Sequence, residues 1–342
     1  MNARPDILPL TIPVIIGPTA GGKTALAVEL AHRFEQKTGV LGEVISADSI
    51  QVYKRLDIGS AKPTEEEKRG VAHHLIDHVE PTEAYSVDRW LREAEVLVDE
   101  IRGRGATPIV VGGTHLYVKA FLEGLFEGPP PDPALRAALH AMPSEERRVE
   151  LERIDPAAAM RIHPNDTRRT VRALEVYRQT GTPLSEQQSQ WDRGHRRTDA
   201  MPVALLWPSE LINSRINTRV RLMVEQGLVE EVRKLWEAGD LDSQAGEALG
   251  YKQFLGHFRG EITLEKAIEQ VRIETRRFAK NQRTWLRRLV GVATGSDRAN
   301  LDPESVCVDI NRRAACCLDA ATTDPEGWPD LVEAALGCSN PG

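Results

Sequence analysis

Apolar runs long enough to cross a membrane are missing from this chain, and residues 1–13 lack the apolar centre of a secretion signal. Cysteine is scarce: the 342 residues include Cys307, Cys316, Cys317 and Cys338, whose spacing suits neither a metal site nor a disulfide framework. These absences argue against a membrane-spanning protein and against a disulfide-stapled domain. We expect reduced cysteines, no membrane partner and a location in the cytoplasm.

The chain also lacks the basic excess of many nucleic-acid-binding proteins, because 44 Lys and Arg stand against 51 Asp and Glu, for a formal net charge of −7. The acidic excess is concentrated at one end, since residues 291–342 hold nine acids and three Lys or Arg. The preceding residues are therefore close to neutral and can carry local basic stripes, on which phosphate contacts depend. The net charge does not exclude a nucleic-acid partner.

Four apolar stretches predict buried strands, at Ile12–Ile16, Glu43–Ala47, 107–113 and 202–207. Helical periodicity lies between the first three, for example at 24–36 and 87–102. Strands that alternate with helices form parallel sheets with right-handed crossovers. The chain is therefore predicted to have an α/β fold, with a parallel sheet flanked by helices as in P-loop NTPases.

The third and fourth strands are separated by residues 114–201, too many for an ordinary crossover. The proline-rich stretch 127–133 marks the start of a largely helical insertion. We predict a core at 1–126 and 201–290, whose second part ends in a basic helix, and a helical insertion domain at 127–200. An acidic tail follows at 291–342, and the sequence does not indicate its role.

A glycine-rich loop follows the first strand: residues 17–24 read GPTAGGKT and fit the pattern G-x-x-x-x-G-K-[ST]. Its glycines let backbone N–H groups approach a phosphate, Lys23 adds a positive charge, and the Thr24 hydroxyl can bind Mg²⁺. The loop does not say whose phosphate it holds. ATP is the obvious candidate, but the third strand ends in IVVGGTHLY without a Walker B acid, and the guanine-selecting Asn-Lys-x-Asp is absent. Nothing beyond the loop indicates an NTPase.

Asp48 comes directly after the second predicted strand, at the same edge of the sheet as the phosphate loop. There its carboxylate can serve as a general base or as an outer-shell partner of Mg²⁺. The alternative is an N-cap or Asx turn that begins the next segment. Both interpretations of Asp48 stay open on the sequence.

Two predicted helices carry clusters of positive charge. The helix within 163–183 has Arg168, Arg169 and Arg172 on a face apart from its apolar one. In the helix at 264–290, basic residues recur every three or four positions beside a separate packing face, at Arg272, Arg276, Lys280, Arg283 and Arg287. Such a stripe suits the phosphate backbone of a nucleic acid, although charged helix faces also occur without a partner. Arg215 and Arg219 suit either a phosphate site or the surface.

Six stretches occur in order over most of residues 12–290: GPTAGGKT, ISADSIQVYKRLDIGSAKPT, VGGTHLY, RIHPNDTRRTVRALEVY, GYKQ and QRTWLRR. In these stretches the chain resembles the tRNA dimethylallyltransferases, the isopentenyltransferase family that prenylates tRNA. The resemblance implies transfer of the dimethylallyl group from dimethylallyl diphosphate to N6 of the adenosine 3′-adjacent to the anticodon. Diphosphate would leave, with Mg²⁺ as cofactor and no ATP consumed. The implied partner is the anticodon stem-loop of tRNA, and we expect a monomer.

The resemblance also implies roles for single residues. Asp48 would accept the N6 proton and Thr114 would lie beside the reacting centre. The diphosphate would be bound by Gly17, Thr19, Ala20, Gly21, Gly22, Lys23, Thr24 and Arg219, with the metal on Thr24. Contacts with tRNA are implied for Asp48, Ser49, Ile50, Gln51, Thr114, Arg136, Arg168, Arg169, Arg172, Glu247, Gly250, Tyr251, Lys252, Lys280, Gln282, Arg283, Thr284, Trp285 and Arg287.

The chain departs from the family's pattern at Ser60, where Thr is usual, and at His115, where Gly or Met is common. Glu247 and Asn281 stand where basic residues are often found. These departures bear on tRNA affinity rather than on the chemistry.

Three alternatives fit parts of the sequence: a P-loop kinase of a small metabolite, an adenylate isopentenyltransferase, and an RNA-binding protein without catalysis. The kinase leaves the basic stripe at 272–287 unexplained.

Overall fold

The computed structural model describes residues 11–125, 128–192, 197–290, 307–310, 313–320 and 323–338. The chain forms two compact units, Lys119–Arg197 and the remainder, which joins Met1–Val118 to Thr198–Gly342. We refer to them as the insertion unit and the core unit. The insertion unit begins earlier than the expected boundary at 127, because the division falls within helix α4 (His115–Glu123).

Seven strands in the described part of the core unit form one sheet, in the order β3-β2-β4-β1-β5-β7-β6. Their bounds are β1 Ile12–Ile16, β2 Glu43–Ala47, β3 His73–His74, β4 Pro108–Gly112, β5 Ala200–Leu206, β6 Cys307–Ile310 and β7 Arg313–Asp319. All neighbours are parallel except β6 and β7. The predicted α/β fold and its four strands are confirmed, whereas β3, β6 and β7 were not expected.

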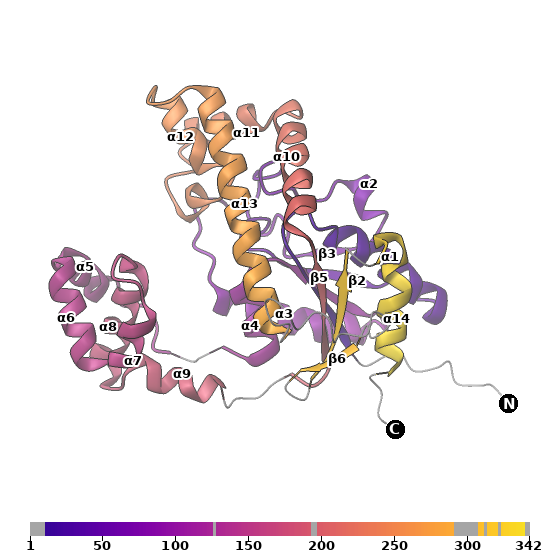
Figure 1. The fold of residues 1–342 in the computed structure, drawn as a ribbon, viewed down its shortest axis with the longest axis horizontal. Helices are drawn as coiled ribbons and strands as arrows, with labels where there is room; N and C mark the ends of the chain where they lie inside the picture. Colours follow the sequence, from indigo (N-terminus) through magenta and orange to yellow (C-terminus); the bar gives the residue numbers. More distant parts are fainter. Residues whose placement is uncertain are drawn as a thin grey trace. The chain divides into compact units, whose positions relative to one another are not determined.

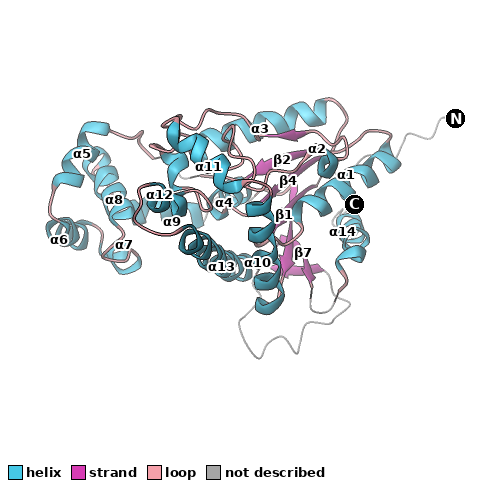
Figure 2. Ribbon diagram, turned by 90° about the horizontal axis from the view of Figure 1, so that it is seen from above, coloured by secondary structure: helices cyan, strands magenta, loops and turns pink. Residues whose placement is uncertain are grey.

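Helices lie on both faces of this sheet (Figure 2). Besides α4, the core unit has α1 Lys23–Thr38, α2 Glu65–Lys68, α3 Val87–Gly103, α10 Ser209–Glu225, α11 Leu228–Glu237, α12 Lys252–Phe258, α13 Leu264–Leu289 and α14 Trp328–Cys338, with 3-10 turns at Gln244–Glu247 and Pro325–Gly327. Helix α13 packs against α10 and α12 (Figure 1). Its buried face includes Ala279, Gln282 and Leu286, which leaves most of its basic residues at the surface.

Strand β7 and helix α14, which lie in the acidic stretch 291–342, belong to the core unit. Strand β7 extends the sheet by pairing in parallel with β5, and α14 packs against α1 (Figure 1). Glu333 forms ion pairs with Arg33 and Lys37 at 3.3 and 3.1 Å, and the indole of Trp328 lies edge-on to Trp207. The acidic side chains of α14 therefore stabilise its docking on basic residues of α1.

The described part of the insertion unit is helical beyond α4, with α5 Pro133–Ala141, α6 Ser144–Ile154, α7 Pro156–Arg161, α8 Thr167–Thr180 and α9 Leu184–Asp192. Leu139, Leu151 and Leu174 are fully buried in its core. Helix α8 begins where the sequence predicted, since the Asp166 side chain accepts a hydrogen bond from the Arg169 N–H. It ends at Gly181, whose φ of 71° lies in the left-handed region that glycine tolerates.

Candidate active site

The phosphate loop lies between β1 and α1, at the carboxyl ends of the parallel strands. Gly22 adopts a φ of 84° and precedes α1 without a side-chain cap, so the first N–H groups of the helix are not bonded by a capping side chain. A Cβ added to Gly21 would lie 2.9 Å from the Pro18 carbonyl oxygen, and one added to Gly17 would lie 2.9 Å from Leu205. The glycines therefore permit the loop's tight path, which leaves the N-terminus of α1 open to an anion.

A cavity of about 600 Å³ opens over this loop and collects groups from distant parts of the core unit. It is lined by residues of the phosphate loop, by Asp48 and Gln51 after β2, by Gly112 and Gly113 after β4, by Arg215 and Arg219 from α10, and by Gln282 from α13. The sequence predicted that the ends of β1 and β2 would meet at one edge, and the structure adds the end of β4. The structure confirms that meeting and adds α10 and α13 as the other walls.

Three cations line this cavity, Lys23, Arg215 and Arg219, beside the carboxylates of Asp48 and Glu67. Burial lowers the pKa of the Lys23 ammonium to about 8; Asp48 acts against that change and Arg219 acts with it. Burial likewise lowers the pKa of the Arg219 guanidinium, which stays far above neutrality. Lys23 donates a hydrogen bond to the Pro18 carbonyl oxygen at 2.9 Å. Two partly desolvated cations favour an anion of high charge in the cavity.

The carboxylate of Asp48 forms a turn and also lines the cavity, so its position agrees with both interpretations that the sequence left open. Its Oδ1 accepts hydrogen bonds from the N–H groups of Ile50 and Gln51, at 2.9 and 3.2 Å, which is an Asx turn at the end of β2. The same side chain lines the cavity beside Lys23. The turn fixes one oxygen by backbone donors, so the orientation of the carboxylate toward the cavity is set before any ligand arrives.

Thr114 connects the end of β4 to the segment after β2. Its Oγ1 accepts a hydrogen bond from the Ser49 N–H at 3.1 Å and donates to the Ser49 hydroxyl at 3.4 Å. Gln51 continues this connection, because its amide donates to the carbonyl oxygens of Ser60 and Ala61 at 3.3 and 3.1 Å. The predicted site residues 48–51 are thus held in one hydrogen-bonded group with Thr114.

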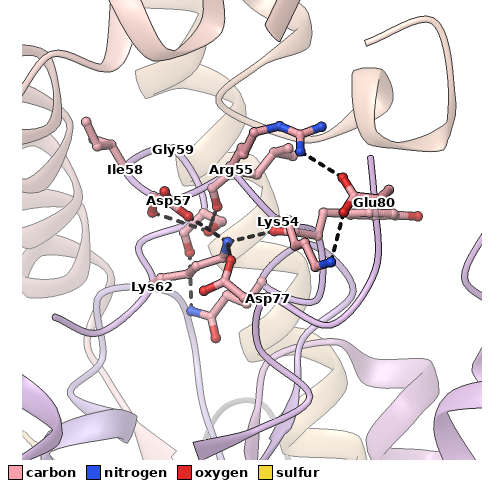
Figure 3. A network of polar contacts seen from close by, with 12 residues as sticks. Lys54, Arg55, Asp57, Ile58, Gly59, Lys62, Asp77 and Glu80 are labelled. Carbon is pink, nitrogen blue, oxygen red and sulfur yellow. Dashed lines mark hydrogen bonds and ion pairs between the residues drawn. The ribbon is translucent and has the colours of Figure 1, made fainter. Parts of the chain in front are cut away.

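A network of ion pairs fixes the following segment, residues 54–62, against the rest of the core unit (Figure 3). Lys62 donates to the Tyr53 carbonyl oxygen at 2.6 Å and to Asp57 at 2.7 Å, and it also pairs with Asp77. Arg55 pairs with Glu80 at 2.7 Å (Figure 3). The cations of this stretch are therefore engaged within the protein, where they brace the segment whose Ser60 and Ala61 line the cavity.

Glu231 of α11 completes that fixation from the other side. Its carboxylate accepts hydrogen bonds from the successive backbone N–H groups of residues 57–59, at 2.8 to 3.2 Å. It also accepts from the Tyr251 hydroxyl at 2.7 Å, and that hydroxyl in turn accepts from the Ser60 N–H at 3.2 Å. Sequence reasoning missed Glu231, since a single acid in an amphipathic helix carries no motif.

The stretch 247–252 divides into buried and exposed members. Tyr251 is fully buried, and the Gly250 N–H donates to the buried Gln253 side chain at 2.9 Å. Glu247 and Lys252 are exposed, and Lys252 lies 3.4 Å from Glu274. Only these exposed side chains present surface to a partner, whereas the Tyr251 side chain anchors the loop at residue 60. The tRNA contacts expected from the sequence for this stretch stay predictions.

A basic groove of about 410 Å³ runs along α13 and α10. It is lined by Ser209, Asn213, Ile273, Arg276, Arg277, Lys280, Arg283, Thr284 and Arg287. Arg283 donates to the Ser209 hydroxyl at 2.7 Å, and Arg276 donates to Asn217 and lies 3.4 Å from Glu269. Four members of the predicted stripe thus line the groove together with Arg277, which sequence reasoning had not singled out. The fifth member, Arg272, does not line it and lies 3.2 Å from Glu269.

The arginines of the insertion unit differ in their surroundings. Arg136 forms a two-pronged ion pair with the fully buried Glu175, at 2.9 and 3.0 Å, and Arg172 reaches the same carboxylate at 2.7 Å. Arg168 and Arg169 are exposed. The pairing leaves Arg136 and Arg172 a structural function in joining α5 to α8, and contact with tRNA stays a prediction for all four.

His115, one of the departures from the family's pattern, stacks on Trp285 with ring centroids 4.4 Å apart. Burial lowers the pKa of the imidazole from 6.5 to about 4, so the folded state holds it neutral.

We expect the melting temperature to fall as the pH drops from about 6.5 toward 4, because the imidazole of the unfolded chain takes up a proton before that of the folded chain does. In His115→Phe, which keeps the stack, the fall should be shallower. The exposed His140→Phe is the control, and equal slopes in all three proteins would contradict the assignment.

No helix in the parts of the chain that the structure describes is both long and apolar enough to span a membrane. Within the same parts, no group of three or more His, Cys, Asp or Glu side chains could hold a metal ion. A divalent ion at the cavity would therefore depend on a few oxygen donors from the protein, such as the Thr24 hydroxyl and the Asp48 carboxylate, and on ligands supplied by an anion and water.

Comparison with known proteins relates this site to a family. The family model "IPP transferase" matches residues 51–289, and the model "Isopentenyl transferase" matches residues 10–83. A protein of Geobacillus thermodenitrificans called tRNA dimethylallyltransferase is 44% identical over 307 residues, covering 87% of this chain and 93% of its own. One of the same name from Acetivibrio thermocellus is 45% identical over 285 residues, or 82% and 89% of the two chains.

Two solved structures share the fold. The full-length tRNA isopentenylpyrophosphate transferase of Bacillus halodurans superposes with a TM-score of 0.64 at 35% identity, covering 96% of this chain and 97% of its own. A eukaryotic dimethylallyltransferase acting on tRNA gives a TM-score of 0.75 at 29% identity, covering 95% and 77%. With matches over most of its length, and with a phosphate loop and Asp48 at one cavity, this chain belongs to the IPP transferase family.

Proposed function

We propose that this protein transfers the dimethylallyl group from dimethylallyl diphosphate to N6 of the adenosine 3′-adjacent to the anticodon in tRNA. The observation that carries the proposal is the single cavity in which a phosphate loop, two partly desolvated cations and the Asp48 carboxylate meet. The site thus offers an anion-binding loop for a leaving group and, beside it, an acceptor for a proton. That pairing fits a transfer in which a diphosphate departs and an amine is deprotonated.

The diphosphate would be bound by the loop residues Gly17 to Thr24 and by Arg219. Backbone N–H groups at the start of α1, the Lys23 ammonium and the Arg219 guanidinium all favour negative charge that builds up on the departing oxygens. Because these donors are fixed by the fold, they need little rearrangement when the carbon–oxygen bond of the donor breaks. The stabilisation is therefore largest in the transition state, as catalysis requires.

In the transfer itself, the adenine N6 attacks C1 of the dimethylallyl group while the bond from C1 to the diphosphate oxygen breaks. The diphosphate leaves with the electron pair, and the N6 proton moves to the Asp48 carboxylate. The N6 amine becomes acidic only as the new bond forms, so Asp48 acts in the chemical step. Thr114 holds the Ser49 backbone through Oγ1 and thereby positions the segment that carries Asp48. The adenine must leave its stack to reach this cavity.

Mg²⁺ fits this donor set, with the Thr24 hydroxyl as a direct ligand and Asp48 as an outer-shell partner. When bound, the ion supplies further positive charge for the diphosphate oxygens. The protein would hold it in the manner usual for Mg²⁺, through few side chains together with phosphate and water oxygens.

The tRNA would lie over the exposed basic side chains of the core unit, with the groove along α13 as its phosphate site. We expect the insertion unit to contribute Arg168 and Arg169, which are exposed.

The test of the whole proposal is incubation of the purified protein with dimethylallyl diphosphate, Mg²⁺ and unmodified tRNA, followed by mass analysis of the nucleosides. One adenosine should gain a C5H8 unit. A phosphorylated metabolite formed from ATP, or prenylation of free AMP with no reaction on tRNA, would instead favour the alternatives.

Replacing Arg277, Lys280 and Arg287 together by Gln should weaken tRNA binding and flatten its dependence on salt. With each phosphate contact that is lost, fewer counterions are released when tRNA binds. The magnitude of the slope of log K against log salt then falls by roughly 0.7–0.9 per contact. The affinity for the prenyl donor should not change, because these side chains lie in the groove rather than in the cavity.

The matched control is the triple variant Lys37→Gln, Arg69→Gln and Arg92→Gln, which removes the same charge from cations ion-paired elsewhere on the core unit. It should leave the salt slope within about 0.5 of the wild type, because it breaks no phosphate contact. If both triple variants keep the wild-type slope, the groove along α13 is a solvated surface and tRNA binds elsewhere.

A further inference from the structure

Gln282 is a buried polar residue in the middle of α13, where its neighbours on the exposed side are cations. Its side chain is 3% exposed and lies between two loops of the cavity. The Oε1 atom accepts a hydrogen bond from the Thr19 N–H at 2.8 Å, and Nε2 donates to the Gly113 carbonyl oxygen at 3.0 Å. One amide thus joins the phosphate loop to the turn that carries Thr114.

Few side chains could take this place. The side chain must accept a hydrogen bond from the Thr19 N–H and donate one to the Gly113 carbonyl oxygen. Among uncharged side chains, only an amide of this length does both. The turn is fitted to it as well, since a Cβ on Gly113 would lie 2.3 Å from Nε2 of Gln282. The glycine of the Gly-Gly-Thr turn therefore makes room for the Gln282 amide.

The same helix turn presents Lys280 and Arg283 to the basic groove. Gln282 is two residues from Lys280 and one from Arg283. If phosphates bound in the groove shift α13, the shift therefore also moves Gln282. Through Gln282 it acts on the Thr19 backbone in the phosphate loop and on the Gly113 carbonyl beside Thr114.

We propose that Gln282 is a positioning residue that couples tRNA binding on α13 to the geometry of the diphosphate loop. This inference rests on the proposed function, because it requires phosphates of tRNA in the groove along α13. Coupling between two binding sites is reciprocal: if tRNA strengthens donor binding by some factor, the donor strengthens tRNA binding by the same factor. Through Gln282, tRNA bound on α13 thereby holds the phosphate loop more firmly in the geometry that binds the donor.

The experiment measures the dissociation constant of a non-reacting analogue of dimethylallyl diphosphate, with Mg²⁺, in the absence and presence of a saturating anticodon stem-loop. For the wild type we expect the stem-loop to tighten analogue binding by about 5–100-fold, the usual range of coupling between sites. In Gln282→Met, which keeps the volume and loses both hydrogen bonds, the factor should fall to within about twofold of unity. The binary affinity for the stem-loop should change little, because Gln282 is buried away from the groove.

Two further variants keep the test decisive if Gln282→Met fails to fold. Gln282→Asn retains an amide, but its side chain is one methylene too short to reach both partners. Gly113→Ala keeps the glutamine at position 282, but the added methyl group pushes the Gln282 amide away from the turn. Both should also abolish the coupling. The matched control is Gln253→Met, which removes another buried glutamine with two hydrogen bonds from the same unit. It should lose stability yet keep the wild-type coupling factor.

An unchanged coupling factor in the Gln282 variants would overturn the inference, as would a wild type in which the stem-loop has no effect on analogue binding. Failure of the proposed function looks different. In that case the stem-loop would not be prenylated at all, or the arginine and lysine variants of the groove would bind it with the wild-type salt slope.

Discussion

Asp48→Asn should lower the single-turnover rate of prenyl transfer by about 10²- to 10⁴-fold, the usual contribution of a general base. The substitution separates the two functions of this side chain. The Asn Oδ1 can still accept from the Ile50 and Gln51 N–H groups, so the turn after β2 should survive. What is lost is the negative charge that receives the N6 proton. We therefore expect a near-normal melting temperature and near-normal tRNA affinity beside the slow chemical step.

The rate and the melting temperature are best measured on one preparation, with tRNA and donor both saturating. Asp132→Asn is the matched control, because Asp132 likewise accepts from a backbone N–H, that of Leu135, at the start of a helix outside the cavity. It should react at the wild-type rate. A folded Asp48→Asn protein with a rate close to that of the wild type would remove Asp48 from the mechanism and leave it as a turn residue.

Lys23→Met should weaken the use of the prenyl donor by about 10- to 100-fold in kcat/KM, which corresponds to the roughly 1.5–3 kcal/mol of a hydrogen bond to a charged group. The free protein should not lose stability on this account, since burial makes the Lys23 charge costly and lowers its pKa to about 8. In the wild type, dimethylallyl diphosphate with Mg²⁺ should raise the melting temperature, because a ligand that binds only the folded state stabilises it. That rise should be much smaller in the variant.

Lys37→Met provides the control, since Lys37 lies at the other end of α1, where it pairs with Glu333. Its donor-dependent rise in melting temperature should equal that of the wild type. The identity of the ligand is tested with ATP and Mg²⁺ in parallel. If ATP stabilises the protein and the prenyl donor does not, the loop binds a nucleotide and the assignment to a prenyl diphosphate is wrong.

The sequence predicted the central part of the fold because its signals are local. Strands β1, β2 and β4 are short apolar runs with turn residues at their ends, and the phosphate loop is a motif whose glycines are needed by backbone geometry. Strand β7 escaped prediction, since RAACCLD has no alternation and lies in an acidic stretch. It is a strand because β5 offers it an edge to pair with, and that edge exists only in the folded sheet.

By itself, the sequence determined the α/β class, the phosphate loop, the acid after β2 and the basic stripe of α13. Each of these follows from the spacing of residues within one segment. Only the tertiary structure decided which of the predicted residues face a ligand. Tyr251 and Gln282 read as members of RNA-contact motifs, yet both are buried and bond to loops of the cavity, whereas Lys280 and Arg277 open onto the groove. The physical reason is that a polar side chain serves the interior or the surface according to the partners that folding brings beside it. For Gln282, one of those partners lies 263 positions away in the chain.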